Sequence, residues 1–202
     1  MRRRICGALT ALLCLTFVGA SRPPGQQLTL HAESQLWFDG TSTLRDWSCK
    51  ATAIQSAIES AIDANGVLAV AEVLNARKAV KAATLTFPTA KLDCDNGTMN
   101  GHMLRALNAT AHPVITFAMA DYELSAAMPV VGQLRGMLTI NGVARSVTFP
   151  ATFEAGPAGA LRVTGSYALD MTAWGVAPPK LMLGTLKVRG LVTVGFNLLL
   201  QH

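Results

Sequence analysis

The sequence predicts an all-β fold of about eight antiparallel strands, arranged as a barrel or a sandwich, with one short helix. Apolar and polar residues alternate in the second half of the chain, as in Leu161–Asp170, and this alternation is typical of strands with one buried face. Asn141-Gly142 lies between two such runs and predicts a tight type I′ hairpin. Helical segments do not alternate with these strands, so a parallel sheet is not expected.

The N-terminus has the three parts of a secretory signal peptide. Met1–Arg4 is basic, an apolar run extends from Ile5 to about Val18, and small residues at Val18 and Ala20 predict cleavage before Ser21. A lipid anchor on Cys14 is a weaker alternative, because Leu13 precedes it where a small residue is usual.

Cleavage divides the chain into a signal peptide, residues 1–20, and one domain, residues 21–202. The apolar run is shorter than the ~20 residues of a spanning helix, and no stretch of the mature chain is long and apolar enough to span a membrane. We therefore expect a periplasmic or secreted protein.

The charge of the mature chain argues against a nucleic-acid partner. Without the three arginines at positions 2–4, 14 Lys and Arg remain against 12 Asp and Glu, a net charge of +2. Nucleic-acid binding needs clustered cations to neutralise phosphates. Half of all residues are hydrophobic and only 14% are charged, which indicates more apolar surface than a small core needs.

The expected strands share period-two alternation or a short apolar run between turn residues. They are Gln35–Thr43, Asp46–Ile58, Ala82–Phe87, Val114–Leu124, Leu138–Ile140, Val147–Glu154, Leu161–Asp170 and Val188–Leu200. The Ala-rich stretch 56–81 is ambiguous, and we interpret Val67–Val73 within it as a strand followed by a loop. Pro178-Pro179 predicts a rigid turn before the last strand.

One helix is expected between the strands. Met99, Met103 and Leu107 recur at the spacing of one helix face, Asn96 or Thr98 can cap its start, and Pro113 follows its end. The helix either plugs one end of a barrel or forms a methionine-rich lid over a ligand, and the two interpretations are compatible.

Cys49 and Cys94 are the cysteines of the mature chain. In an oxidising compartment they form either one disulfide or two buried free thiols. We expect no metal, because CxxC is absent and the four histidines, His31, His102, His112 and His202, show no ligand spacing. No cofactor motif is present, so none is expected.

Two features favour a lumen that holds a ligand. Val114–Leu124 is apolar on both parities, and Gly136 and Gly165 stand where inward side chains would fill space. The alternative for the glycines is relief of strain at barrel corners.

We do not expect an enzyme. The sequence lacks H-E-x-x-H, G-x-S-x-G and a phosphate-binding glycine loop. The alternative is a hydrolase in which Asp46, His102 and a Ser or Thr converge, although their spacing does not demand it.

Four stretches in order resemble the YceI-like family of periplasmic, polyisoprenoid-binding proteins. They are GTSTLRDW at 40–47, the helix and strand MNGHMLRALNATAHPVITF at 99–117, the hairpin GMLTINGVARSVT at 136–148, and DMTAWGVAPP followed by LMLGT at 170–185. Arg45 stands where the first motif usually has histidine. The resemblance covers nearly all of the mature chain.

This resemblance implies a lipocalin-like barrel with a tubular apolar pocket for an isoprenoid, quinone-type or fatty-acyl lipid, and it implies no reaction. In the branch with the DW opening, cysteines often occur at the places of Cys49 and Cys94, which favours the disulfide. An envelope structural or stress-response barrel with a filled core is the alternative.

The candidate site residues follow from these motifs. The expected apolar lining comprises Trp47, Phe87, Phe117, Met119, Met171 and Trp174, and the expected lid comprises Met99, Met103 and Leu107. Asp46, His102 and Arg105 are expected at the mouth, where Arg105 suits a phosphate. For each residue, ordinary packing, capping or surface exposure is the alternative. The last strand is apolar on both parities near 196–200, so pairing into a homodimer is a further hypothesis.

Overall fold

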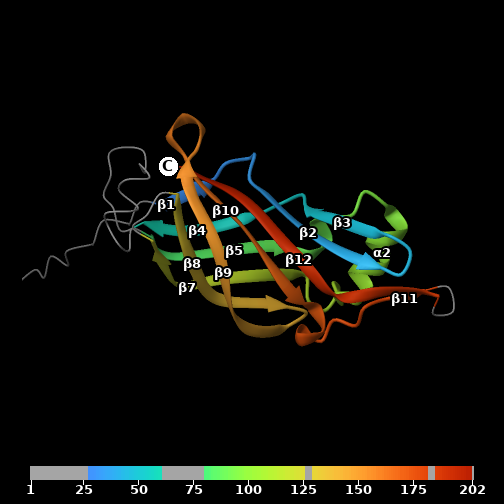
Figure 1. The fold of residues 1–202 in the computed structure, drawn as a ribbon. Coiled ribbons are helices and arrows are strands. Elements are labelled where there is room, and N and C mark those ends of the chain that lie inside the picture. The colour runs from blue at the N-terminus through green and yellow to red at the C-terminus, as the bar shows by residue number, and fades with distance from the viewer. Residues whose placement is uncertain (1–26, 61–79, 126–128, 182–184, 202) are drawn as a thin grey trace, which may run out of the picture.

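The computed structural model describes residues 27–60, 80–125, 129–181 and 185–201 (Figure 1). The expected signal peptide and the interpretation of Val67–Val73 as a strand lie outside these residues. No helix in the described ranges is long and apolar enough to cross a membrane.

The described residues contain twelve strands in one sheet system. The strands are β1 (Gln27–Leu30), β2 (Gln35–Ser42), β3 (Asp46–Ala51), β4 (Gln55–Ser60), β5 (Val80–Pro88), β6 (Leu92–Asp93), β7 (Val114–Leu124), β8 (Val130–Ile140), β9 (Val143–Ala155), β10 (Leu161–Asp170), β11 (Lys180–Leu181) and β12 (Leu186–Gln201). Helix α2 spans Gly97–Ala106, and the 3₁₀ turns η1 (Thr89–Lys91), η2 (Pro157–Gly159) and η3 (Met171–Trp174) connect strands.

These strands form a closed antiparallel barrel of eight wall strands, as predicted. Three of the eight wall strands are each made of two consecutive segments: β1 with β2, β3 with β4, and β5 with β6. The segments pair in step, because β1 pairs with β4 and β4 with β5, while β2 pairs with β3 and β3 with β6. The ring closes where Leu30 pairs with Leu200, which joins β1 to β12. The ring is complete through β1, β4 and β5, whereas β6, among the described strands, pairs with β3 alone.

The β8–β9 hairpin turns at Asn141-Gly142, as the sequence predicts. Both residues have positive φ, 49° and 73°, which a type I′ turn requires. A Cβ on Gly142 would lie 2.5 Å from the ring of His112, so the turn packs closely against the segment that leads into β7.

A β-bulge explains the apolar residues on both parities of β7. The register with β8 shifts between Met119 and Asp121, so Phe117 faces the lumen before the bulge and Tyr122 and Leu124 face it afterwards. One extra residue therefore exchanges the two faces of the strand. The two apolar parities reflect this bulge rather than a strand that is apolar on both sides.

Gly136 and Gly165 lie inward, but they do not leave space in the lumen. A Cβ on Gly136 would lie 2.6 Å from the ring of Phe117, and one on Gly165 would lie 2.5 Å from the ring of Phe196. Aromatic side chains from neighbouring strands occupy both places. The interpretation that these glycines leave lumen volume is therefore wrong. Relief of strain stays the alternative, because the nearest atoms to the two Cβ positions are the backbone carbonyls of Ala118 and Pro150, at 2.4 and 2.3 Å.

The apolar residues on the outer parity of β12 are also explained within one chain. Leu199 is 2% exposed, and a Cβ on Gly156, beside η2, would lie 3.1 Å from its Cδ2. The β9–β10 connection thus covers this side chain. The observation that suggested a homodimer therefore has an intramolecular cause, and a dimer stays a hypothesis.

We predict that Gly136→Ala destabilises the barrel by about 1–3 kcal/mol, because its Cβ would overlap the Phe117 ring and the Ala118 carbonyl. Gly101→Ala is the control, since nothing lies within 4 Å of its Cβ, and it should stabilise helix α2 by up to about 1 kcal/mol. Urea unfolding of both variants checks the opposite signs. Equal stability of Gly136→Ala and the wild type would contradict the packing described here.

Candidate functional site

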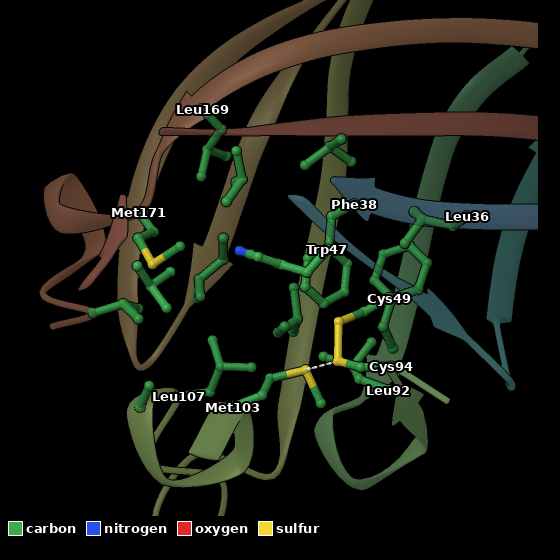
Figure 2. A pocket seen from close by; sticks show the side chains of 18 of the residues that line it. Leu36, Phe38, Trp47, Cys49, Leu92, Cys94, Met103, Leu107, Leu169 and Met171 are labelled. Atoms are coloured by element: carbon green, nitrogen blue, oxygen red, sulfur yellow. Dashed lines mark hydrogen bonds between the residues drawn. A yellow bond between two sulfur atoms is a disulfide. The ribbon is translucent and has the colours of Figure 1, made fainter. Parts of the chain in front are cut away.

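A cavity of about 390 Å³ occupies the end of the barrel beneath helix α2 (Figure 2). This volume lies within the range of small-molecule sites, about 300–1,000 Å³. Inward residues of the strands form most of its wall, and α2 contributes Met99, Met103 and Ala106. The wall is almost entirely apolar, so the cavity suits a hydrocarbon group.

Seven of the nine predicted lining and lid residues border the cavity, namely Trp47, Phe87, Met99, Met103, Leu107, Phe117 and Met171. Met119 and Trp174 do not border it. Met119 packs against the core, and Trp174 is buried with its indole Nε1 donating to the Leu138 carbonyl at 3.0 Å. A ligand-binding role for the nine residues stays a prediction.

Aromatic rings mark the far limit of the cavity. Phe149 makes edge-to-face contacts with Phe117, Tyr167 and Phe196 at centroid distances of 5.2, 5.0 and 6.2 Å. Past these rings, Leu198 still borders the cavity, but most inward residues belong to the core and do not border it. They include Leu28, Ile58, Val130, Phe153, Leu161 and Val163. The barrel is therefore hollow at one end and packed at the other.

The polar residues of the wall gather at the α2 end. They are Ser42, Arg45, Asn96, Thr98 and His102. Of the three predicted mouth residues, His102 alone borders the cavity. Arg105 is exposed and its Nη2 lies 2.7 Å from Nδ1 of His102, while Asp46 is exposed outside the wall.

Arg45 is a wall residue that the sequence reasoning missed as a site candidate. It follows the tip of the β2–β3 hairpin, where Thr43 donates hydrogen bonds to the carbonyls of Thr185, just before β12, and of Lys187 within β12. The signal was present in the sequence, because Arg45 occupies the histidine place of the GTSTLRDW motif.

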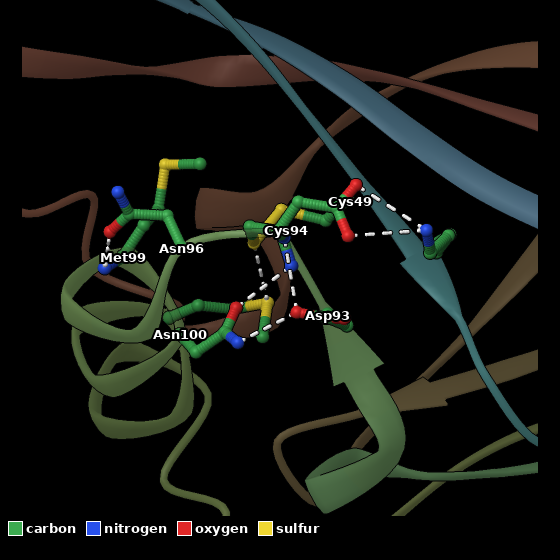
Figure 3. The surroundings of a disulfide bond; sticks show 9 residues. Cys49, Asp93, Cys94, Asn96, Met99 and Asn100 are labelled. Atoms are coloured by element: carbon green, nitrogen blue, oxygen red, sulfur yellow. Dashed lines mark hydrogen bonds and ion pairs between the residues drawn. A yellow bond between two sulfur atoms is a disulfide. The ribbon is translucent and has the colours of Figure 1, made fainter.

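A disulfide fixes the start of α2 to the wall, as the sequence analysis favours (Figure 3). Cys49 on β3 and Cys94 before the helix are joined, and both border the cavity. The Met103 sulfur lies 3.6 Å from that of Cys94, so the helix contacts the bridge directly. Asn96 caps the helix by accepting from the Met99 amide at 2.9 Å.

Asn100 adds a polar anchor beside the disulfide. Its amide nitrogen donates to Asp93 at 2.8 Å, and its amide oxygen accepts from the Cys94 backbone N–H at 2.8 Å (Figure 3). The bond from Asn100, with a smaller contribution from the Asp95 backbone N–H at 3.0 Å, lowers the pKa of Asp93 below its ordinary value. No local sequence pattern indicates this contact, because it joins a strand to a helix.

Trp47 carries the unpaired polar atom of the wall. A Cβ on Gly40 would lie 2.1 Å from its indole, so glycine lets the ring lie flat against β2, and Phe38 meets it edge-on at 5.9 Å. The indole Nε1 is buried and has no hydrogen-bond partner among the described residues. Figure 2 shows this nitrogen pointing into the cavity.

The arrangement offers binding chemistry rather than a recognisable reaction centre. Asp46 lies outside the wall, so the described residues do not bring it together with His102 in the cavity as a hydrolytic pair. Within the described ranges, no three His, Cys, Asp or Glu side chains cluster to hold a metal ion. The cavity can enclose an apolar group and contact a polar one at its mouth.

Solved structures show the same fold at low sequence identity. BcnA from Burkholderia cenocepacia superposes with a TM-score of 0.63 and 18% identity, over 83% of this chain and 96% of that chain. A polyisoprenoid-binding domain from Saccharophagus degradans, implicated in plant cell wall breakdown, gives 0.62 and 14%, over 87% and 97%. The YceI protein of Campylobacter jejuni gives 0.52 and 16%, over 93% and 92%.

The sequence has no match among curated proteins. The model of the YceI-like domain, however, matches residues 26–200, which include all the described strands except the last residue of β12. This match spans well over half of the chain and agrees with the fold of the solved relatives. The chain therefore belongs to the YceI-like family.

Proposed function

We propose that this protein is an exported carrier that holds one long apolar lipid inside its barrel and catalyses no reaction. The observation that carries the proposal is the apolar cavity of about 390 Å³, whose polar residues lie at the α2 end. Burying hydrocarbon in such a space is favourable by about 25 cal/mol per Å² of apolar surface. A core filled by side chains, as a purely structural barrel requires, leaves no such space.

The lipid enters tail first and leaves its polar end at the mouth. The far limit of the cavity is the aromatic layer around Phe149, which offers nothing to a charged group. Arg45, His102 and Arg105 lie at the opposite end, with Asp46 nearby. This polarity fits an isoprenoid, quinone-type or fatty-acyl lipid with a compact head.

The S. degradans relative supports the ligand class, because it is described as polyisoprenoid-binding. The Cys49–Cys94 bridge supports export, because disulfides persist in oxidising compartments. Residues 1–20 supply the expected signal peptide, and a periplasmic or secreted location follows from it.

Native mass spectrometry of protein from its own cell envelope tests the proposal. We expect a stoichiometric apolar adduct, which organic extraction then identifies. Leu134→Trp fills the cavity and should reduce lipid occupancy at least tenfold, whereas Val131→Trp, on the exposed face of the same strand, should not.

Circular dichroism establishes that each variant is folded, and Met103→Trp fills the cavity from the helix should Leu134→Trp fail to fold. A wild-type protein that carries no adduct and takes up no added quinone or polyprenyl lipid would contradict the carrier function. Equal lipid uptake by the inward and outward variants would place the ligand elsewhere.

The hydrogen bond from Asn100 on α2 to Asp93 on β6 predicts faster lipid release in acid. Because the folded pKa of Asp93 is lowered, its stabilising contribution is complete above the ordinary carboxyl pKa of about 4 and is lost as pH falls through the lowered value. Release should therefore accelerate below about pH 4. Asp93→Asn should release lipid faster at neutral pH and depend less on acid.

Asp170→Asn is the matched control. Its pKa is lowered too, by Thr172, but it caps η3 and does not contact α2. Stopped-flow transfer of a fluorescent fatty acid to vesicles measures both release rates. The same acid dependence in the wild type and in Asp93→Asn would exclude Asp93 as the group responsible.

A further inference from the structure

The indole N–H of Trp47 has no acceptor in the part of the chain that the structure describes. The buried indole of Trp174 shows the usual arrangement, since its Nε1 donates to the Leu138 carbonyl at 3.0 Å. Leaving a buried donor unpaired is costly, so native proteins rarely do so without a reason. The unpaired atom lies in the wall of the proposed lipid site.

Among the described residues, the groups packed against the Trp47 ring are apolar and do not accept a hydrogen bond from it. The ring lies against Gly40 and meets the edge of Phe38, and the disulfide of Cys49 lies one inward position farther along β3. Glycine at position 40 is required for this placement, because any Cβ there would overlap the indole at 2.1 Å. The chain thus holds the donor in place and directs it at the cavity (Figure 2).

We propose that Trp47 Nε1 donates a hydrogen bond to a carbonyl oxygen of the bound lipid. This inference rests on the lipid-carrier function proposed above and specifies the chemistry of its ligand. The carbonyl belongs either to a quinone ring or to an acyl amide or ester, since both present a neutral oxygen on a long apolar chain.

A neutral carbonyl fits this position better than an anionic head group. One uncharged N–H donor satisfies a carbonyl oxygen, whereas a phosphate or carboxylate needs cations or several donors. The cations of this end are exposed: Arg45 follows the hairpin tip and Arg105 contacts His102. Trp47, which pairs with Gly40 across β2 and β3, is half-buried. Removing a full charge from water at such a position is costly.

Such a donor selects among lipids of equal apolar content. A hydrocarbon that fills the same space leaves the N–H unpaired, so its binding does not offset the free-energy cost of the unpaired donor. A carbonyl lipid removes the cost on binding. The expected difference is about five- to tenfold in Kd, the usual worth of one neutral hydrogen bond.

Two matched probe pairs test this inference by isothermal titration calorimetry. Decylubiquinone is compared with decylbenzene, and hexadecanamide with hexadecane. The wild type should bind at least one carbonyl probe about five- to tenfold more tightly than its hydrocarbon partner, and the stronger pair identifies a quinone or an acyl ligand.

Trp47→Phe keeps an aromatic ring and removes the donor, so the two members of each probe pair should bind it with about equal affinity, because the smaller ring changes the space available to both members alike. Trp37→Phe is the control, because its indole lies on the outer parity of β2 over Gly195. A second measurement needs no folded variant: the ¹⁵N-indole resonance of wild-type Trp47 should move downfield with the carbonyl probe and not with its hydrocarbon partner.

The outcomes separate the two proposals. Wild-type protein that binds none of the four probes overturns the lipid-carrier function itself. Wild-type protein that binds both members of each pair equally, with the same affinities in Trp47→Phe and an unmoved indole resonance, overturns the role of Trp47 alone.

Discussion

The pairing of β12 with the start of the chain is the constraint on which the structure depends. β12 pairs with β10 along one edge and with β2 and β1 along the other, so the ring closes only when the last strand meets the first two. A closed ring of eight strands is just wide enough either to be filled by side chains or to hold one slender ligand. At each position along the barrel axis, the inward side chains decide whether the lumen is filled or left open to a ligand. Here the packed end and the hollow end share the same wall.

The aromatic layer around Phe149 divides the two ends, and glycines make it possible. Phe117 and Phe196 lie over Gly136 and Gly165, where any side chain would displace the rings. The glycines therefore set where the cavity ends rather than creating its volume. At the hollow end Gly40 does the same for Trp47, whose ring lies along the wall instead of across the lumen. Each glycine thus fixes the position of one ring.

Local patterns predict most elements, because strand alternation, the Asn141-Gly142 turn and the Asn96 cap depend on residues close in sequence. The bulge in β7 and the breaks between β1 and β2 depend on neighbouring strands, so the sequence shows only an irregular alternation. For the site, parity predicts which residues point inward but not their level along the barrel. Phe117 and Met119 share a parity, yet only Phe117 borders the cavity. The Asn100 anchor and the unpaired Trp47 donor are tertiary, and no local pattern contains them.

The lid and the wall leave selectivity to a few polar atoms. The Cys49–Cys94 bridge and Asn100 fix the start of α2, while Met99 and Met103 present flexible thioethers that adapt to irregular apolar chains. A wall of this kind accepts many lipids of suitable width, because dispersion and burial carry little directional information. Selecting one lipid over another then requires a polar group that makes a directional hydrogen bond and that the surrounding residues hold in place. Trp47, fixed between Gly40 and Phe38 with its N–H toward the lumen, meets both conditions, whereas the exposed cations at the mouth meet only the first.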